Sequence, residues 1–115
     1  MVRRQGTGIS EIRENMRGGK GIVRLEHFWN KGEMQPRMRL CARLVIEPGA
    51  SIGTHRHEQE EEVYIVVRGR GRLSDGAETT EIGPGDTVLT GHGGEHAVEN
   101  IGAEPLEIIA VITTF

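Results

Sequence analysis

Turn-forming residues recur at short intervals along most of this chain. Examples are Pro48-Gly49, Asp75-Gly76 and Gly83-Pro84-Gly85, and the runs between them are rich in valine, isoleucine, leucine and threonine. Short aliphatic and β-branched runs bounded by such signals are typical of strands in an all-β sandwich or barrel. The predicted strands are 21–28, 38–47, 52–56, 61–68, 71–75, 78–82, 87–90, 95–100 and 105–114.

The two ends of the chain differ from this pattern in opposite ways. Residues 9–17 (ISEIRENMR) are interpreted as one or two helical turns with Ser10 as a possible N-cap. Residues 1–20 are expected to be mobile, or to be ordered only by packing on another subunit. Residues 105–114 are almost continuously apolar, which indicates a strand covered on both faces.

Length and composition exclude several classes of protein. A chain of 115 residues suits one domain. No basic stripe alternates with aromatic residues, which argues against nucleic-acid binding, and no run approaches the ~18 apolar residues of a membrane span. Cys41 is the only cysteine, so no disulfide can form within the chain and a cytoplasmic location is expected.

Three histidines and one glutamate have the spacing of a metal site. His55, His57 and Glu62 lie in one short segment, and His96 follows some forty residues later. Alternate residues of a strand face the same way, so His55 and His57 can point into one cavity. Imidazole and carboxylate groups bind first-row divalent metals at neutral pH. Glu61 also has an allowed spacing, but Glu62 shares its strand face with Tyr64 and is preferred.

These residues resemble the two sequence motifs of the cupin family. The motifs cover residues 49–100, and all four metal-ligand positions are filled. Glycine at position 91 replaces the usual proline, which leaves the turn before His96 looser than in the family pattern. The matching residues are Gly49, His55, His57, Glu62 and Gly69 in the first motif, and Gly85, Gly93, His96 and Asn100 in the second.

The resemblance implies a double-stranded β-helix, which is the cupin jelly-roll barrel, with a divalent transition metal held by His55, His57, Glu62 and His96. Manganese is ranked first, and iron, zinc, nickel and cobalt are also compatible. The family further implies a homodimer in which N-terminal segments pack across subunits. We therefore expect an N-terminal extension with a dimer-packing strand over residues 1–37, and a cupin barrel over residues 38–115.

Two functions follow from this site. The first is a metal-dependent enzyme that acts on a small carboxylate- or diketone-like substrate, of the decarboxylase or dioxygenase type, as in chains described as oxalate decarboxylases. The second is a non-catalytic module that binds a small ligand or a metal. No catalytic residue is identified, because no acidic residue is placed beside the open metal positions.

Other polar residues have weaker functional interpretations. His92 is an exposed loop residue or a group at the rim of the site, and His27 is structural or exposed. Arg39 and Arg43 are expected to face solvent, although an arginine that faced the pocket could bind an anionic substrate. The acidic run from Glu58 onwards is expected to be a solvated turn apart from Glu62. Cys41 is interpreted as a small buried apolar residue or as a pocket-lining one.

Overall fold

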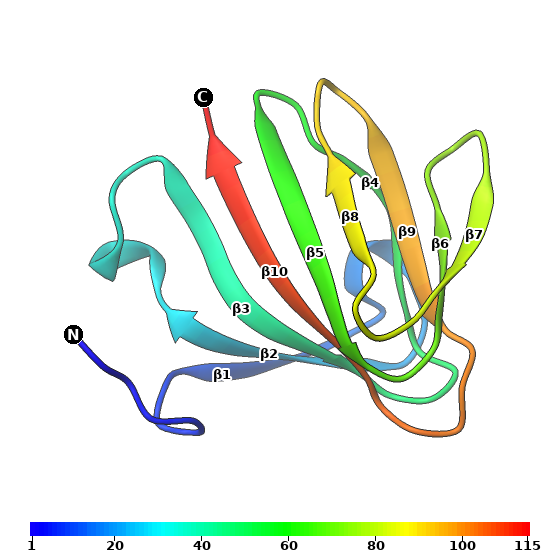
Figure 1. Ribbon diagram of the computed structural model, residues 1–115, viewed down its shortest axis with the longest axis horizontal. Coiled ribbons are helices and arrows are strands. Elements are labelled where there is room, and N and C mark those ends of the chain that lie inside the picture. Colours follow the sequence, from blue (N-terminus) through cyan, green and yellow to red (C-terminus); the bar gives the residue numbers. More distant parts are fainter.

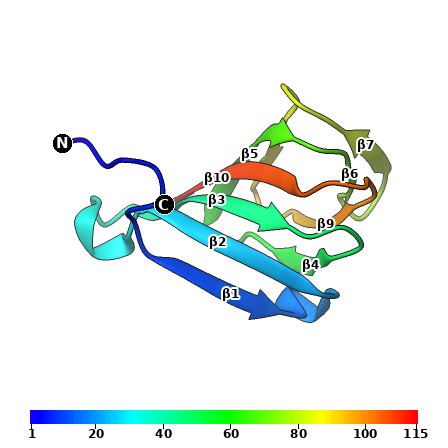
Figure 2. The same cartoon turned by 90° about the horizontal axis from the view of Figure 1, so that it is seen from below.

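The computed structural model describes residues 1–115 and contains two antiparallel sheets that face each other (Figure 1, Figure 2). The larger sheet has the strand order β1-β2-β3-β10-β5-β8, and the smaller has the order β4-β9-β6-β7. This is the cupin jelly-roll fold. The strands are β1 (Ser10–Glu14), β2 (Ile22–Trp29), β3 (Met38–Ile46), β4 (Ser51–Arg56), β5 (Glu60–Arg68), β6 (Gly71–Ser74), β7 (Thr79–Ile82), β8 (Thr87–Thr90), β9 (Glu95–Asn100) and β10 (Leu106–Thr114).

All nine strands predicted from the sequence are confirmed, each to within one or two residues at its ends. Two short 3₁₀ helices, η1 (Met16–Gly18) and η2 (Lys31–Glu33), are the only helical elements. Accordingly, no helix is long and apolar enough to cross a membrane.

The helical interpretation of residues 9–17 was wrong. Ser10 begins strand β1 instead of capping a helix, and β1 pairs antiparallel with β2 of the same chain. The free edge of β2 offers the backbone of residues 10–14 a full set of partners, which outweighs a weak helical preference. Asn15 and Arg17 then adopt left-handed conformations, with φ of 51° and 54°, that end any regular structure. This segment thus has a place in the sheet without a second subunit.

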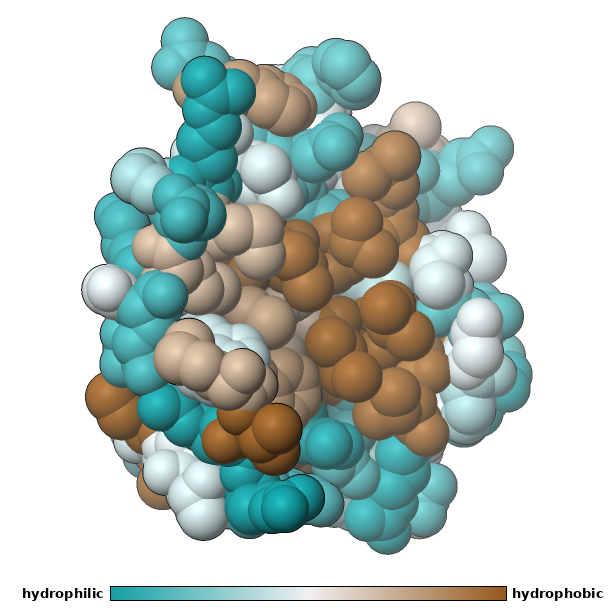
Figure 3. All heavy atoms as spheres, turned by 60° about the vertical axis from the view of Figure 1, so that its left-hand side comes forward, coloured by the Kyte–Doolittle hydropathy of each residue, from teal (hydrophilic) through white to brown (hydrophobic).

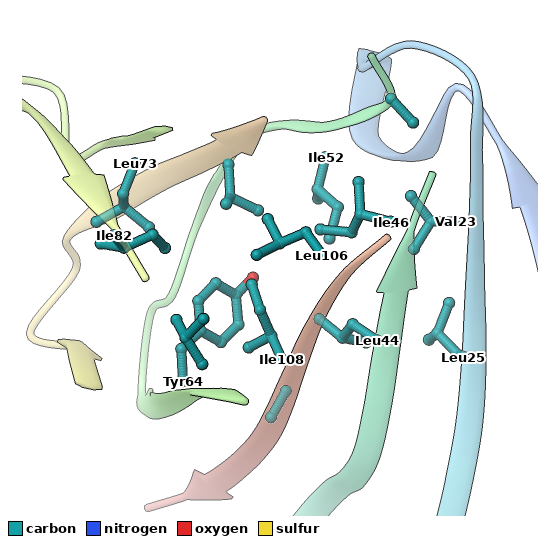
Figure 4. Close-up of a cluster of buried hydrophobic side chains, with 14 residues drawn as sticks. Val23, Leu25, Leu44, Ile46, Ile52, Tyr64, Leu73, Ile82, Leu106 and Ile108 are labelled. Carbon is teal, nitrogen blue, oxygen red and sulfur yellow. The ribbon is translucent and has the colours of Figure 1, made fainter. Parts of the chain in front are cut away.

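Apolar side chains from both sheets fill the space between them (Figure 4). Tyr64, Leu44 and Ile108 come from the larger sheet, and Ile52 and Val98 come from the smaller one. All five are at most 2% exposed. This core occupies one end of the sandwich and leaves the other end, where β5 and β9 begin and β10 finishes, for polar groups.

The outer face of the larger sheet carries an apolar surface (Figure 3). Ile65 and Val67 on β5 and Leu89 on β8 are 38%, 39% and 67% exposed, and the pairing of Val63 with Leu89 puts them on one face. Ile109 and Val111 of β10 lie beside them and are only half-buried. Coverage of residues 105–114 on both faces, as expected from their sequence, is therefore incomplete in a single chain.

Candidate metal centre

Three strands from the two sheets bring the predicted ligand residues together. His55 on β4 and His96 on β9 are directly opposite each other in the smaller sheet. His57 lies just beyond β4, where its backbone continues the pairing through hydrogen bonds with Gly93 and Gly94. Glu62 reaches the same point from β5 in the larger sheet. The alternation of His55 and His57 about an outward Arg56 is as the sequence predicted.

The ligating atoms of these residues converge on one point. His96 Nε2 lies 3.0 Å from the Nε2 atoms of both His55 and His57. Glu62 Oε1 lies 3.0 Å from Nε2 of His57 and of His96. All four atoms lie within 4.8 Å of one another. His57, Glu62 and His96 are buried, whereas His55 is partly open to solvent.

The opposite nitrogen of each imidazole is also occupied. His55 Nδ1 donates to the carbonyl oxygen of Gly53 at 2.8 Å, and His57 Nδ1 donates to a carboxylate oxygen of Glu60 at 2.5 Å. His96 Nδ1 lies 2.9 Å from the Thr90 hydroxyl. Since a carbonyl and a carboxylate can only accept, the neutral rings of His55 and His57 carry their proton on Nδ1. Their Nε2 lone pairs therefore face the central point.

This arrangement suits a divalent cation. Lone pairs 3.0 Å apart repel each other unless a positive charge lies between them. Glu62 Oε1 is buried without a hydrogen-bond donor, because its contacts with the histidines lack the necessary direction. Adjacent ligand atoms of an octahedral ion with bonds of about 2.1 Å would lie about 3.0 Å apart. The four side chains could therefore hold a metal ion, which would polarise a bound carboxylate or carbonyl.

The same proximity changes the proton affinity of the site. The Glu62 carboxylate raises the pKa of His57, with burial acting in the opposite direction and Glu60 adding to the increase. Burial lowers the pKa of His55. Burial would raise the pKa of Glu62, but the imidazoles of His57 and His96 outweigh it and hold that pKa below its usual range. Without a metal, His57 is thus the histidine of this pair that binds a proton more readily.

Two residues that were expected to face solvent belong to the site. Glu60 bonds His57, so the acidic run is not a solvated turn at this position. Arg39 donates to both oxygens of Glu60 and lines the cavity beside the metal group. A β-bulge explains the error for Arg39, because it leaves the residue without a partner on β10 and breaks strict alternation. Arg43 does lie on the outer face, where it pairs with Glu26 and Glu107.

A cavity of about 90 Å³ adjoins the ligand cluster. Besides Arg39, its polar lining includes Glu11 and Arg13 from β1, Arg17 from η1 and His27 from β2. Glu11 and His27 contact each other at 3.0 Å. The sequence gave no role to these side chains, because residues 9–17 were interpreted as helical. Read as a strand, the same segment would have placed Glu11 and Arg13 on one face.

The remaining candidate residues lie outside the site. His92 is exposed in its loop and has a φ of 55°. Cys41 lies half-buried on β3, opposite Val111. Glu61 points away from the ligand cluster and approaches Gly91 so closely that a β-carbon there would lie 2.8 Å from its own. This contact gives a packing reason for glycine where the family pattern has proline.

Size alone does not locate the site. A larger hollow of about 290 Å³ lies between residues 1–10 and the end of β2. Its lining contains no group of converging ligands like the one formed by His55, His57, Glu62 and His96.

A double-stranded β-helix with three histidines and one glutamate at its open end defines a class of small metal-site barrels. Residues 42–112 match the model of the Cupin domain. The chain belongs to the cupin family, as the motifs predicted.

Similar proteins cover the whole of this chain. It is 41% identical over 117 residues to the oxalate-binding protein of Thermotoga maritima, with 95% of this chain and 97% of that protein aligned. A crystal structure called a predicted oxalate decarboxylase, also from T. maritima, is 40% identical, with a TM-score of 0.95 and complete coverage of both chains. A Cupin 2 conserved barrel domain protein from Salinispora arenicola shares the fold at 23% identity, with a TM-score of 0.76 over 98% of this chain and 87% of that one.

Proposed function

We propose that this protein binds a divalent transition metal through His55, His57, Glu62 and His96, and uses it to bind a small dicarboxylate of the oxalate type. The convergence of three Nε2 atoms on a buried carboxylate oxygen without a donor is the observation that carries the proposal. Four protein ligands leave two positions of an octahedral ion for two ligand oxygens. Manganese is our first choice among the compatible ions.

The charges around the cavity favour a dianion. Three arginines, at positions 13, 17 and 39, face three glutamates, at positions 11, 60 and 62. These side chains cancel in formal charge, so a bound divalent ion would leave two positive charges uncompensated. Burying uncompensated charge is costly, and a ligand with two negative charges would neutralise it.

The size of the cavity favours a compact ligand. A volume of about 90 Å³ corresponds to roughly three water molecules at the ~30 Å³ that each occupies in the liquid. This suits a ligand of a few heavy atoms such as oxalate, and it argues against sugars and flavonoids. The name of the T. maritima oxalate-binding protein supports the same choice.

Catalysis on the same ligand is the second candidate. Loss of CO₂ from a carboxylate leaves a carbanion that must take up a proton. Glu11, in contact with His27 in the cavity wall, is a carboxyl group that could supply it. This observation favours a decarboxylase over a dioxygenase, and it provides the acidic residue that the sequence alone did not identify.

Titration calorimetry of untagged protein tests the proposal. Oxalate should bind to the Mn²⁺-loaded protein and not to the metal-free protein, and the longer succinate should bind at least tenfold more weakly. Equal binding of oxalate with and without metal would contradict the proposal. Formate and CO₂ release from oxalate, compared between the native protein and Glu11→Gln, distinguishes an enzyme from a binding module.

We further propose a homodimer, in which the N-terminal extension of residues 1–37 contributes to the contact and residues 38–115 form the barrel. The exposed apolar face of the larger sheet, with Ile65, Val67 and Leu89, supports this assembly (Figure 3). Light scattering should give about twice the 12.7 kDa of one chain; a monomer mass would refute it. A cytoplasmic location also remains a prediction.

A further inference from the structure

The three site histidines differ in what holds the nitrogen that faces away from the centre. His55 has a backbone carbonyl there and His96 has a hydroxyl group. Only His57 has a carboxylate, that of Glu60. A carboxylate is the strongest of these three acceptors for an imidazole N–H, because the hydrogen bond is charge-assisted.

The position of Glu60 is itself determined by a second residue. Arg39 Nε donates to Glu60 Oε1 and Arg39 Nη2 donates to Glu60 Oε2, both at 2.9 Å. Such a two-pronged pair specifies the orientation of both groups. The Glu60 side chain is 13% exposed, so water competes little for its oxygens. The β-bulge that turns Arg39 inwards is thus what brings its guanidinium to Glu60.

Glu60 does not act as a fifth ligand in this arrangement. Oε1 accepts from Arg39, and Oε2 accepts from both Arg39 and His57. Glu60 is not among the four residues whose ligating atoms converge. Its contact with the centre runs only through the imidazole of His57.

We infer that Glu60, oriented by Arg39, is a positioning residue for the metal centre. It keeps the proton of His57 on Nδ1 and holds the ring so that Nε2 faces Glu62 and His96. His57 has particular need of this support because it lies beyond the end of β4, where the strand no longer constrains the ring. The inference rests on the proposed metal binding. Residues in this position typically contribute 10–100-fold to metal affinity.

The first test needs no metal. Long-range ¹H–¹⁵N spectra of the metal-free protein with ¹⁵N-labelled histidine, recorded at a pH where the rings are neutral, report which ring nitrogen carries the proton. The native protein should show His57 protonated on Nδ1. In Glu60→Ala the Nε2–H form should become populated, while Glu60→Gln, which retains an acceptor oxygen, should preserve much of the native signal. An unchanged Nδ1–H signal in Glu60→Ala would overturn the inference.

The second test measures Mn²⁺ affinity by competition with a chelator. Glu60→Ala should bind Mn²⁺ 10–100-fold more weakly than the native protein, with a smaller loss in Glu60→Gln. Arg39→Gln, which leaves Glu60 in place, should also bind more weakly and provides a second variant if Glu60→Ala does not fold. Glu58→Ala is the matched control, since Glu58 is exposed in the same acidic run, and its affinity should stay within twofold.

The outcomes separate this inference from the proposed function. Native protein that shows the Nδ1–H form but binds no Mn²⁺ would refute metal binding and leave the positioning of His57 by Glu60 supported. Native protein that binds Mn²⁺, with equal affinity in Glu60→Ala and Glu58→Ala, would overturn the positioning role and leave metal binding intact.

Discussion

Metal addition should stabilise this protein strongly, and the size of the effect can be estimated. A ligand that binds only the folded state adds RT ln(1 + [L]/Kd) to the free energy of unfolding, which is about 2.7 kcal/mol at 100 times Kd. The four ligands meet only in the folded chain, since Glu62 and His96 come from different sheets. The condition for this relation is thus met.

The corresponding change in melting temperature follows from the length of the chain. With an unfolding entropy of about 2.1 cal/mol/K per residue, 115 residues give about 0.24 kcal/mol/K. A gain of 2.7 kcal/mol then raises Tm by about 11 °C. Differential scanning calorimetry of EDTA-treated, untagged protein, with and without Mn²⁺ at 100 times its measured Kd, is the assay.

Variants decide whether the proposed ligands are responsible for the shift. His57→Ala and His55→Ala should each lose most of the Mn²⁺-dependent increase, measured against the metal-free form of the same variant. His92→Ala should keep it, since His92 is exposed and outside the cluster. An increase in His57→Ala as large as in the native protein would refute the assignment of the ligands, and no increase in the native protein would refute metal binding.

Three further predictions test other parts of the structure. Metal analysis of purified His57→Ala should find no bound transition metal, whereas His92→Ala should retain the native amount. The raised pKa of His57 means that the folded metal-free protein binds its proton more tightly than the unfolded chain does. This stability is complete below the unfolded pKa of about 6.5 and is lost as the pH rises through the folded pKa, so urea melts should show declining stability from pH 6.5 towards 8.5. Metal-loaded protein should lack this decline, and its metal occupancy should fall below about pH 6 as the ligand histidines protonate. Gly53→Ala should lower the stability by about 1–3 kcal/mol, because the added methyl group would overlap the carbonyl oxygen of Arg17. Gly32→Ala, whose methyl group meets nothing closer than 3.4 Å, should unfold within about 0.5 kcal/mol of the native protein in the same denaturant titration.

The sequence predicted those parts of the fold that depend on local pattern. Turn residues separate the strands clearly, and alternation within β5 correctly placed Glu62, Tyr64 and Val66 on the buried face. The metal cluster was predictable because its spacing agrees with strand alternation on both sides of His57. No residue type other than glycine fits the close approach of Gly91 to Glu61 without a shift, but this reason was visible only in three dimensions.

The errors arose where a feature depends on contacts between distant segments. Residues 10–14 form a strand because the edge of β2 is available, and no local signal announces that edge. Arg39 faces the cavity because of a bulge against β10, whose register the sequence does not reveal. Glu60 was assigned to solvent because its partners, Arg39 and His57, lie on other elements.

The two layers of the sandwich are held together differently at their two ends. At one end, buried aliphatic side chains join them permanently. At the other, Glu62 of one layer faces histidines of the other, so a cation there would act as a removable clasp. Without it, that end should open first, and amide hydrogens near residues 60–62 and 95–97 should exchange fastest among the central strands. The width of the entrance would then follow the metal supply, so that a cell short of metal would lose the ligand pocket while keeping the folded chain.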